Sequence, residues 1–230
     1  MDRARLPGDP PVEILLRRSA RARRYALRVS ALDGRVTLTL PARGSAAEAL
    51  DFARAREGWI RRALAAQGTV TPVRIGAALP FEGRVLTVTP GRVRAPRAEG
   101  AALLVPPDPE RAALRIATFL KSAARLRLAA AAGRHAATLG REVGRLTLRD
   151  TRSRWGSCTA GGDLMFSWRL VMAPPEVLDY VAAHEVAHFD ELNHSPAFWA
   201  VVARLCPDYG RHRRWLRREG AALHRYRFGD

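Results

Sequence analysis

The chain has 230 residues, of which 47% are hydrophobic and 27% charged, the composition of a globular protein large enough to bury a core. It has no run of about 18 apolar residues, no apolar secretory core near its start and only two cysteines, so we expect a cytoplasmic protein with reduced thiols and no membrane association. The net charge of +17 favours anionic partners such as nucleic acid or nucleotides, although a GC-rich coding sequence would also explain the arginines.

The first hundred residues carry the patterns of β-hairpins. Loosely alternating apolar positions over residues 12–40 surround Asp33-Gly34, a dipeptide typical of tight hairpin turns. A second hairpin is expected with Phe81-Glu82-Gly83-Arg84 as its turn. Residues 91–107 are rich in Gly, Pro and Ala and indicate either a weak strand or a lobe boundary.

One helix is expected between these two hairpins. Ser45 and Glu48 have the spacing of a capping box, and we predict a helix from there to about Ala65. Its apolar residues suit one buried face: Leu50, Phe52, Trp59, Ile60 and Leu64.

The second half is mostly helical. Asp108-Pro109-Glu110 has the cap, proline and acid of a helix start, and that helix is expected to reach about Leu139, before Gly140. Extended segments should follow around the turn cluster at residues 160–163. Three more helices are expected: one from Pro174-Pro175-Glu176 to about Leu192, one from Ser195-Pro196 to about Cys206, and a basic one over residues 208–224.

Strands that precede helices in this way predict an α+β fold. We expect a β-rich N-terminal lobe with one helix over residues 1–107 and a second lobe over residues 108–230 that carries the histidine cluster.

Three of the six histidines and a glutamate lie within eleven residues. His184 and His188 are four apart on a predicted helix, so their imidazoles point the same way and can hold one metal ion. Glu185 lies beside them, as in zinc hydrolases whose glutamate takes a proton from metal-bound water. The pattern therefore predicts a catalytic metal site.

His194 is the expected third ligand. It lies six residues beyond His188, too far round to share the helix face, but Asn193 and Ser195-Pro196 permit a tight turn between two helices. One zinc ion per chain with an open fourth position would suit catalysis. Cys206 could instead close a structural site as a fourth ligand.

The surroundings of this site leave alternatives open. A carboxylate of Asp179, Asp190 or Glu191 could orient a ligand histidine, or each could be a solvated helix residue. The remaining histidines have no partner at ligand spacing and are expected at the surface: His135, His212 and His224.

The sequence also resembles the YgjP-like metallopeptidase domain family, which is related to the SprT-like zinc proteases. The matching features are Arg154-Trp155-Gly156-Ser157-Cys158, an expected Trp168-Arg169-Leu170 strand, Ala173-Pro174-Pro175, Asp179-Tyr180-Val181, the HEVAH helix, Asn193-His194-Ser195 and Phe198-Trp199. The resemblance implies a zincin-like core, zinc ligands His184, His188 and His194, and Glu185 as the general base. Metzincins are a weaker match, because Glu191 replaces their glycine and no Met-turn follows.

The four residues Arg154, Trp155, Gly156 and Ser157 are candidate substrate-binding residues. Their segment could form an edge strand beside the metal and pair with an extended peptide. Alternatively, its Trp and Cys belong to the core. Cys158 as a nucleophile has no visible catalytic partner.

Three functions are compatible with these patterns. The first is a zinc metallopeptidase, with Arg154 or Tyr209 as guesses for oxyanion stabilisation. The second is a metal-dependent nucleotide or pyrophosphate hydrolase, in which arginines would hold phosphate oxygens. The third is a DNA-associated SprT-like protease. The last two would use a basic cluster that follows the site: Arg211, Arg213, Arg214, Arg217 and Arg218.

Overall fold

The computed structural model describes residues 2–30, 34–65 and 70–229, and it divides the chain into two compact units, Met1–Thr69 and Val70–Asp230. The boundary expected between residues 107 and 108 lies inside the second unit. The reason is that Leu86 and Leu103, from the strands before this boundary, share one hydrophobic core with Leu120 and Val181 beyond it. Both units combine helices with small sheets, so the chain has the α+β character that was expected.

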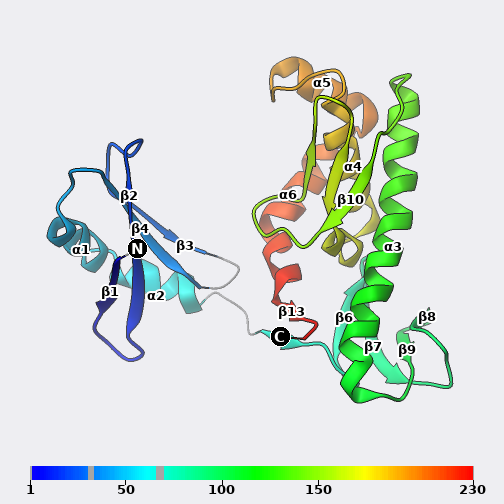
Figure 1. Cartoon of the computed structure of the whole chain (residues 1–230), viewed down its shortest axis with the longest axis horizontal. Coiled ribbons are helices and arrows are strands. Elements are labelled where there is room, and N and C mark those ends of the chain that lie inside the picture. Colours follow the sequence, from blue (N-terminus) through cyan, green and yellow to red (C-terminus); the bar gives the residue numbers. More distant parts are fainter. Residues whose placement is uncertain (1, 31–33, 66–69, 230) are drawn as a thin grey trace. The chain divides into compact units, whose positions relative to one another are not determined.

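The first unit is a four-stranded sheet with two helices (Figure 1). The sheet has the order β1-β2-β4-β3, in which β2 and β4 are parallel and the outer pairs are antiparallel. The hairpin expected around Asp33-Gly34 is the antiparallel pair β3 and β4; Asp33 itself lies outside the described residues. The elements are β1 (Asp2–Leu6), β2 (Val12–Ser19), β3 (Ala26–Val29), β4 (Val36–Pro41), α1 (Ala46–Arg54) and α2 (Glu57–Ala65).

The single helix expected after Ser45 is two helices. The Ser45 hydroxyl accepts a hydrogen bond from the Glu48 N–H at 3.4 Å, as predicted, but the Glu48 carboxylate accepts from the Tyr25 hydroxyl instead of returning to the cap. Ile60 is fully buried, whereas Trp59 is 45% exposed. The buried face that we expected to include Trp59 therefore excludes it.

The second unit contains two larger sheets and one strand pair. A four-stranded sheet has the order β6-β7-β9-β8, a three-stranded sheet has the order β10-β12-β11, and β5 pairs with β13. The expected hairpin turn at Glu82-Gly83 joins β6 to β7, and both residues have positive φ, as tight hairpin turns require. The strands are β5 (Thr71–Pro72), β6 (Ala78–Phe81), β7 (Arg84–Pro90), β8 (Arg97–Glu99), β9 (Ala102–Val105), β10 (Leu146–Arg149), β11 (Gly156–Cys158), β12 (Leu164–Ser167) and β13 (Tyr226–Arg227).

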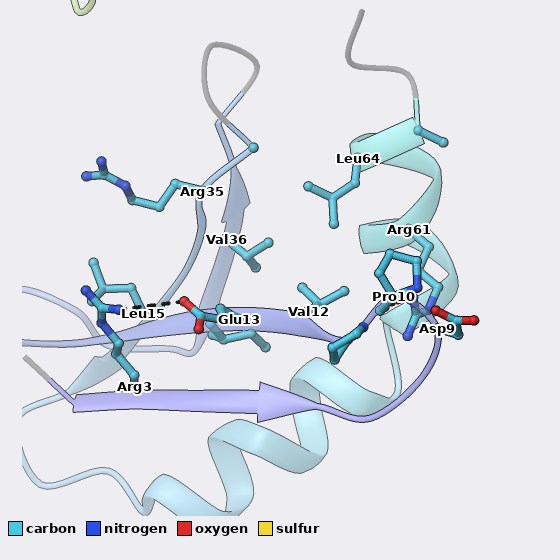
Figure 2. Close-up of a pocket in the computed structure, with 14 residues that line it drawn as sticks. Arg3, Asp9, Pro10, Val12, Glu13, Leu15, Arg35, Val36, Arg61 and Leu64 are labelled. Atoms are coloured by element: carbon cyan, nitrogen blue, oxygen red, sulfur yellow. Dashed lines mark hydrogen bonds and ion pairs between the residues drawn. The ribbon is translucent and has the colours of Figure 1, made fainter. Parts of the chain in front are cut away.

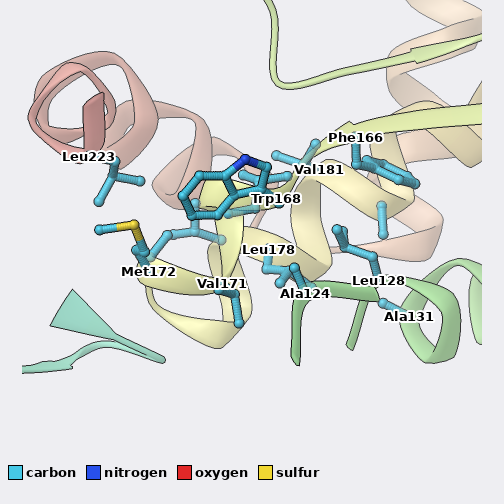
Figure 3. Close-up of a cluster of buried hydrophobic side chains, with 14 of the residues drawn as sticks. Ala124, Leu128, Ala131, Phe166, Trp168, Val171, Met172, Leu178, Val181 and Leu223 are labelled. Carbon is cyan, nitrogen blue, oxygen red and sulfur yellow. The ribbon is translucent and has the colours of Figure 1, made fainter. Parts of the chain in front are cut away.

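The helices of the second unit gather around α4, which contacts α3, α5, α6 and β11. They are α3 (Pro109–Thr138), α4 (Pro175–Ala187), α5 (Pro196–Leu205) and α6 (Tyr209–Glu219), with 3₁₀ helices η1 (Trp168–Met172) and η2 (Gly220–Arg225). Figure 3 shows the core where η1 meets α3 and α4: Trp168, Leu128 and Val181 are among its side chains. Burial of this cluster holds α4 in place from several sides.

Both ends of α3 agree with the sequence. The Asp108 carboxylate accepts a hydrogen bond from the Arg111 N–H at 3.2 Å, and Pro109 occupies the first turn. The helix ends at Thr138, and Gly140 follows with φ of 66°, a conformation that glycine adopts without strain.

Three elements of the structure differ from those that the sequence predicted. Residues 168–170 were expected as a strand but belong to η1, whose five residues are all buried where the chain turns into the core. Helix α4 ends at Ala187 rather than near Leu192, because the chain turns at His188 toward the next helix. The last helix ends at Glu219 and continues as η2.

None of the helices in the described part of the chain is long and apolar enough to cross a membrane.

Candidate metal centre

The three clustered histidines come together at the end of α4. His184 lies in its last turn, His188 caps it, and His194 lies in the turn before α5. One ring nitrogen of each histidine lies within 4.8 Å of the other two. The Nε2 atoms of His184 and His194 are 3.1 Å apart. The spacing in the sequence therefore corresponds to proximity in space.

The turn between α4 and α5 brings His194 back to the helix. The Ser195 N–H donates to the Asn193 carbonyl at 2.8 Å, and the Ser195 hydroxyl caps α5 by accepting from the Phe198 N–H at 3.2 Å. Phe198 is fully buried, and its ring lies 5.0, 4.5 and 4.7 Å from the rings of His184, His188 and His194. Phe198 thus packs against all three imidazoles. The family resemblance included this residue but gave it no role.

The orientation of His188 follows from one hydrogen bond. Its Nδ1 lies 2.9 Å from the backbone carbonyl of Glu191, which can only accept. The proton is therefore on Nδ1, and Nε2 keeps a lone pair for a metal. The residue that orients this ligand is Glu191, as the sequence allowed, but it acts through its backbone and not through its carboxylate.

The other two carboxylates considered for this role have other partners. Asp179 accepts from His135 Nε2 at 3.1 Å and from Arg134 at 2.9 Å. Burial alone would raise the pKa of Asp179, but these two partners hold it below its ordinary value. Asp190 pairs with Arg141 at 3.4 Å. Neither residue orients a ligand histidine.

The donor set fits a divalent metal ion. Burial, followed by the neighbouring imidazoles, lowers the pKa of His184 to about 4. Burial and His188 also lower the pKa of His194. His184 and His194 are therefore neutral, the form that binds metals. Within the described residues no cysteine or carboxylate joins the three histidines, so Cys206 does not complete a four-ligand structural site.

Glu185 is buried beside the ligands, with only 6% of its surface exposed. Burial raises the pKa of its carboxyl group to about 8, although the charge of Arg154 opposes the shift. A carboxylate in this environment readily takes up a proton near neutral pH. Glu185 is not one of the grouped metal-binding residues, which agrees with a role other than coordination.

Gly156 lies directly against Glu185. A Cβ atom on Gly156 would come within 2.6 Å of both Cγ and Oε1 of Glu185, closer than any side chain tolerates. Strand β11 therefore approaches α4 this closely only because residue 156 has no side chain. Among the four expected substrate-binding residues, Gly156 is the one that touches the expected base.

The neighbours of Gly156 have different environments. Trp155 is half-buried, contacts the His224 ring in a tilted arrangement with centroids 5.1 Å apart, and packs closely on Gly220. Ser157 lies in β11, and Arg154 is exposed just before it. Burial raises the pKa of the Cys158 thiol to about 11, which disfavours the thiolate that a nucleophile needs.

The three histidines that were expected at the surface are buried. His135 pairs with Asp179 and His224 packs on Trp155, while His212 lies near Tyr180, with ring centroids 6.5 Å apart. Each meets a partner from a distant part of the sequence, which local patterns cannot show.

The basic cluster on α6 is not uniform. Arg211, Arg214, Arg217 and Arg218 are exposed, but Arg213 is half-buried with its guanidinium 4.4 Å above the Trp199 ring. Tyr209 stacks on the same tryptophan at 5.4 Å. The Trp199 ring lies 5.7 Å from that of His184 and 6.0 Å from that of His194. Arg213 and Tyr209 are therefore held beside the histidines through Trp199.

Comparison with known proteins agrees with this arrangement. No curated protein and no solved structure matches the chain significantly. The family model of the YgjP-like metallopeptidase domain, in contrast, matches residues 23–219, which include the three histidines, Glu185 and Gly156. Because this match covers most of the sequence, the chain belongs to the YgjP-like metallopeptidase domain family.

Proposed function

We propose that the protein is a zinc-dependent metallopeptidase in which His184, His188 and His194 hold one zinc ion and Glu185 is the general base. The observation that carries this proposal is the convergence of three imidazoles on one point. The buried carboxylate of Glu185 lies on the same helix as His184 but is not part of this group. Membership of a metallopeptidase family supports the peptide bond as the substrate.

A bound zinc ion would lower the pKa of a coordinated water and polarise the scissile carbonyl. Glu185 would take a proton from the attacking water and give it to the leaving amine. Its raised pKa suits both steps, because a group with a pKa near the working pH can accept and then release a proton. Gly156 would keep Glu185 in position for this transfer.

Strand β11 would bind the substrate. Among the described residues it lies at the edge of its sheet and pairs with β12 alone, antiparallel. On the side that faces β12, the Trp155 carbonyl accepts a hydrogen bond from the Ser167 N–H, and the Thr159 N–H donates one to the Asp163 carbonyl. Since strand residues alternate, the backbone groups of Gly156 and Cys158 face the open edge, where an extended peptide could add as a further strand.

The first test is the metal content of protein purified without an affinity tag or added metal. We expect about one zinc per chain, the stoichiometry of a single three-ligand site. His194→Ala is the best variant, because His194 is exposed in a turn and its loss leaves the core intact. His188→Ala should lose the metal as well.

Two results would contradict the proposal. One is metal that stays bound in both histidine variants, because the ion would then be elsewhere. The other is zinc-loaded protein that cleaves no peptide in a diverse library.

A further inference from the structure

Arg213 differs from Arg115 and Arg169, two other arginines of the second unit that are at least partly buried. Arg169 is buried but pairs with Asp150 at 2.6 Å, and Arg115 pairs with Asp108 at 3.4 Å. Arg213 is half-buried, yet within the described part of the chain it has no ion pair and no hydrogen bond through its side chain. Its guanidinium lies over the Trp199 ring, 4.4 Å from the ring centroid.

The position of Arg213 is fixed by aromatic packing. Tyr209 and Arg213 are one turn apart on α6, and both contact Trp199, at 5.4 and 4.4 Å. A guanidinium stacked on an indole keeps its in-plane N–H groups available for another partner. Because Trp199 also borders His184 and His194, these donors are held at the rim of the candidate metal centre.

This placement is unfavourable for binding a metal ion. The Trp199 ring under Arg213 lies 5.7 Å from the His184 ring and 6.0 Å from the His194 ring, so a positive charge is held close to both imidazoles. A positive charge this close to the imidazoles opposes a divalent cation there. An anionic group that binds together with the metal ion would offset this repulsion.

A second guanidinium lies near the base. Arg154 lies two residues before Gly156, which touches Glu185, and in the described residues no carboxylate pairs with Arg154. The environment around the histidines and Glu185 is therefore cationic before any metal binds.

We propose that Arg213 binds a carboxylate of the peptide substrate next to the scissile bond, so that the protein prefers acidic peptides. This inference rests on the proposed peptidase function. The guanidinium can donate two parallel hydrogen bonds to one carboxylate, a geometry that a lysine or a diffuse positive surface would not supply.

Binding to zinc-loaded Glu185→Gln protein tests the proposal without catalysis. The ligands are neutral hexapeptides in which one Glu is placed at each position in turn, each with a matched Gln peptide. We expect at least one Glu peptide to bind about tenfold more tightly than its Gln partner, since a charge-assisted hydrogen bond is worth about that much. A further Arg213→Gln substitution should remove the difference.

Arg211→Gln is the matched control. It removes the same charge from the same helix at an exposed position, so it should keep the Glu preference. An equal loss in both variants would mean that long-range attraction, and not Arg213 itself, selects the peptide. Equal affinity of the parent for every Glu and Gln pair would also overturn the proposal.

Zinc affinity separates recognition from a structural role. Arg213→Gln should bind zinc at least as tightly as the parent in competition with a chelator, because a repelling charge is gone. Weaker zinc binding together with a lower melting temperature would mean that Arg213 only supports the site. Glu preference with no cleavage by the protein that retains Glu185 would contradict the peptidase function and leave the role of Arg213 standing.

Discussion

The two units of the chain differ in where they keep polar groups. In the described part of the first unit every buried residue is hydrophobic, whereas all the buried polar and charged residues belong to the second unit: His135, Ser167, Arg169, Glu185, His212 and His224. Burying such groups costs free energy unless they are paired. The described core of the first unit is therefore entirely hydrophobic, whereas the core of the second unit includes polar groups, among them Glu185 at the candidate site.

The first unit shows that a hollow is not by itself a site. It contains a pocket of about 980 Å³ whose lining includes Val12, Val36 and Leu64 (Figure 2). At its border Arg3 pairs with Glu13 at 3.7 Å, and Arg61 donates to the carbonyls of Pro7 and Pro10. These charges already have partners. In the described part of the chain, in contrast, the carboxyl of Glu185 and the guanidinium of Arg213 form no hydrogen bond or ion pair. Unpaired polar groups locate chemistry better than volume does.

The largest effect is expected at Glu185. Replacing it by Gln removes the proton-accepting oxygen but keeps the shape, so peptide cleavage should fall by roughly 10²- to 10⁴-fold. Zinc content should not change, because Glu185 is not a ligand. Steady-state kinetics and metal analysis on the same sample test both parts. Cleavage at the parental rate would assign the base to another residue.

Gly156→Ala should have the next largest effect. The added methyl group would meet Glu185 at 2.6 Å, so strand β11 or the carboxylate must move. A shift of this size should lower cleavage by about 10- to 100-fold. Gly161→Ala is the control, because its nearest atom would be 3.9 Å away. Equal activity in the two variants would show that β11 does not position Glu185.

The next prediction compares the loss of unfolding free energy when one arginine is replaced in each unit. Arg169 donates two hydrogen bonds to Asp150 and two to the carbonyls of Leu223 and Tyr226, so Arg169→Met should cost about 2–4 kcal/mol of unfolding free energy. Arg3→Met breaks only an exposed pair and should cost less than about 0.5 kcal/mol. Urea unfolding measures both. Similar losses would contradict the contrast between the units.

The smallest effect concerns pH. Burial and then Arg169 lower the pKa of His224 to about 4, below the 6.5 of an unfolded histidine. The unfolded chain therefore takes up this proton first as the pH falls, and stability should decrease between about pH 6.5 and 4. His224→Phe keeps an aromatic ring against Trp155 and should make this part of the stability profile flatter. An unchanged slope would assign the pH dependence to other groups.

Local patterns predicted the elements near the site well. Asp108 and Ser195 cap helices as expected, and the Glu82-Gly83 turn joins two strands. Errors arose where tertiary contacts override local preference. The expected strand at residues 168–170 is a buried 3₁₀ helix, and α4 is shorter because the chain must turn for His194 to reach His184.

The sequence by itself determined the metal-binding pattern, because His184, Glu185, His188 and His194 depend on one helix and one turn, whose geometry follows from spacing. It was also sufficient to identify the family. Only the tertiary structure decided that Gly156 lies against Glu185, that Arg213 stacks on Trp199 beside the histidines, and that three further histidines are buried. Each of these contacts joins segments far apart in the chain, and nothing in the local sequence specifies which distant surface a side chain will meet.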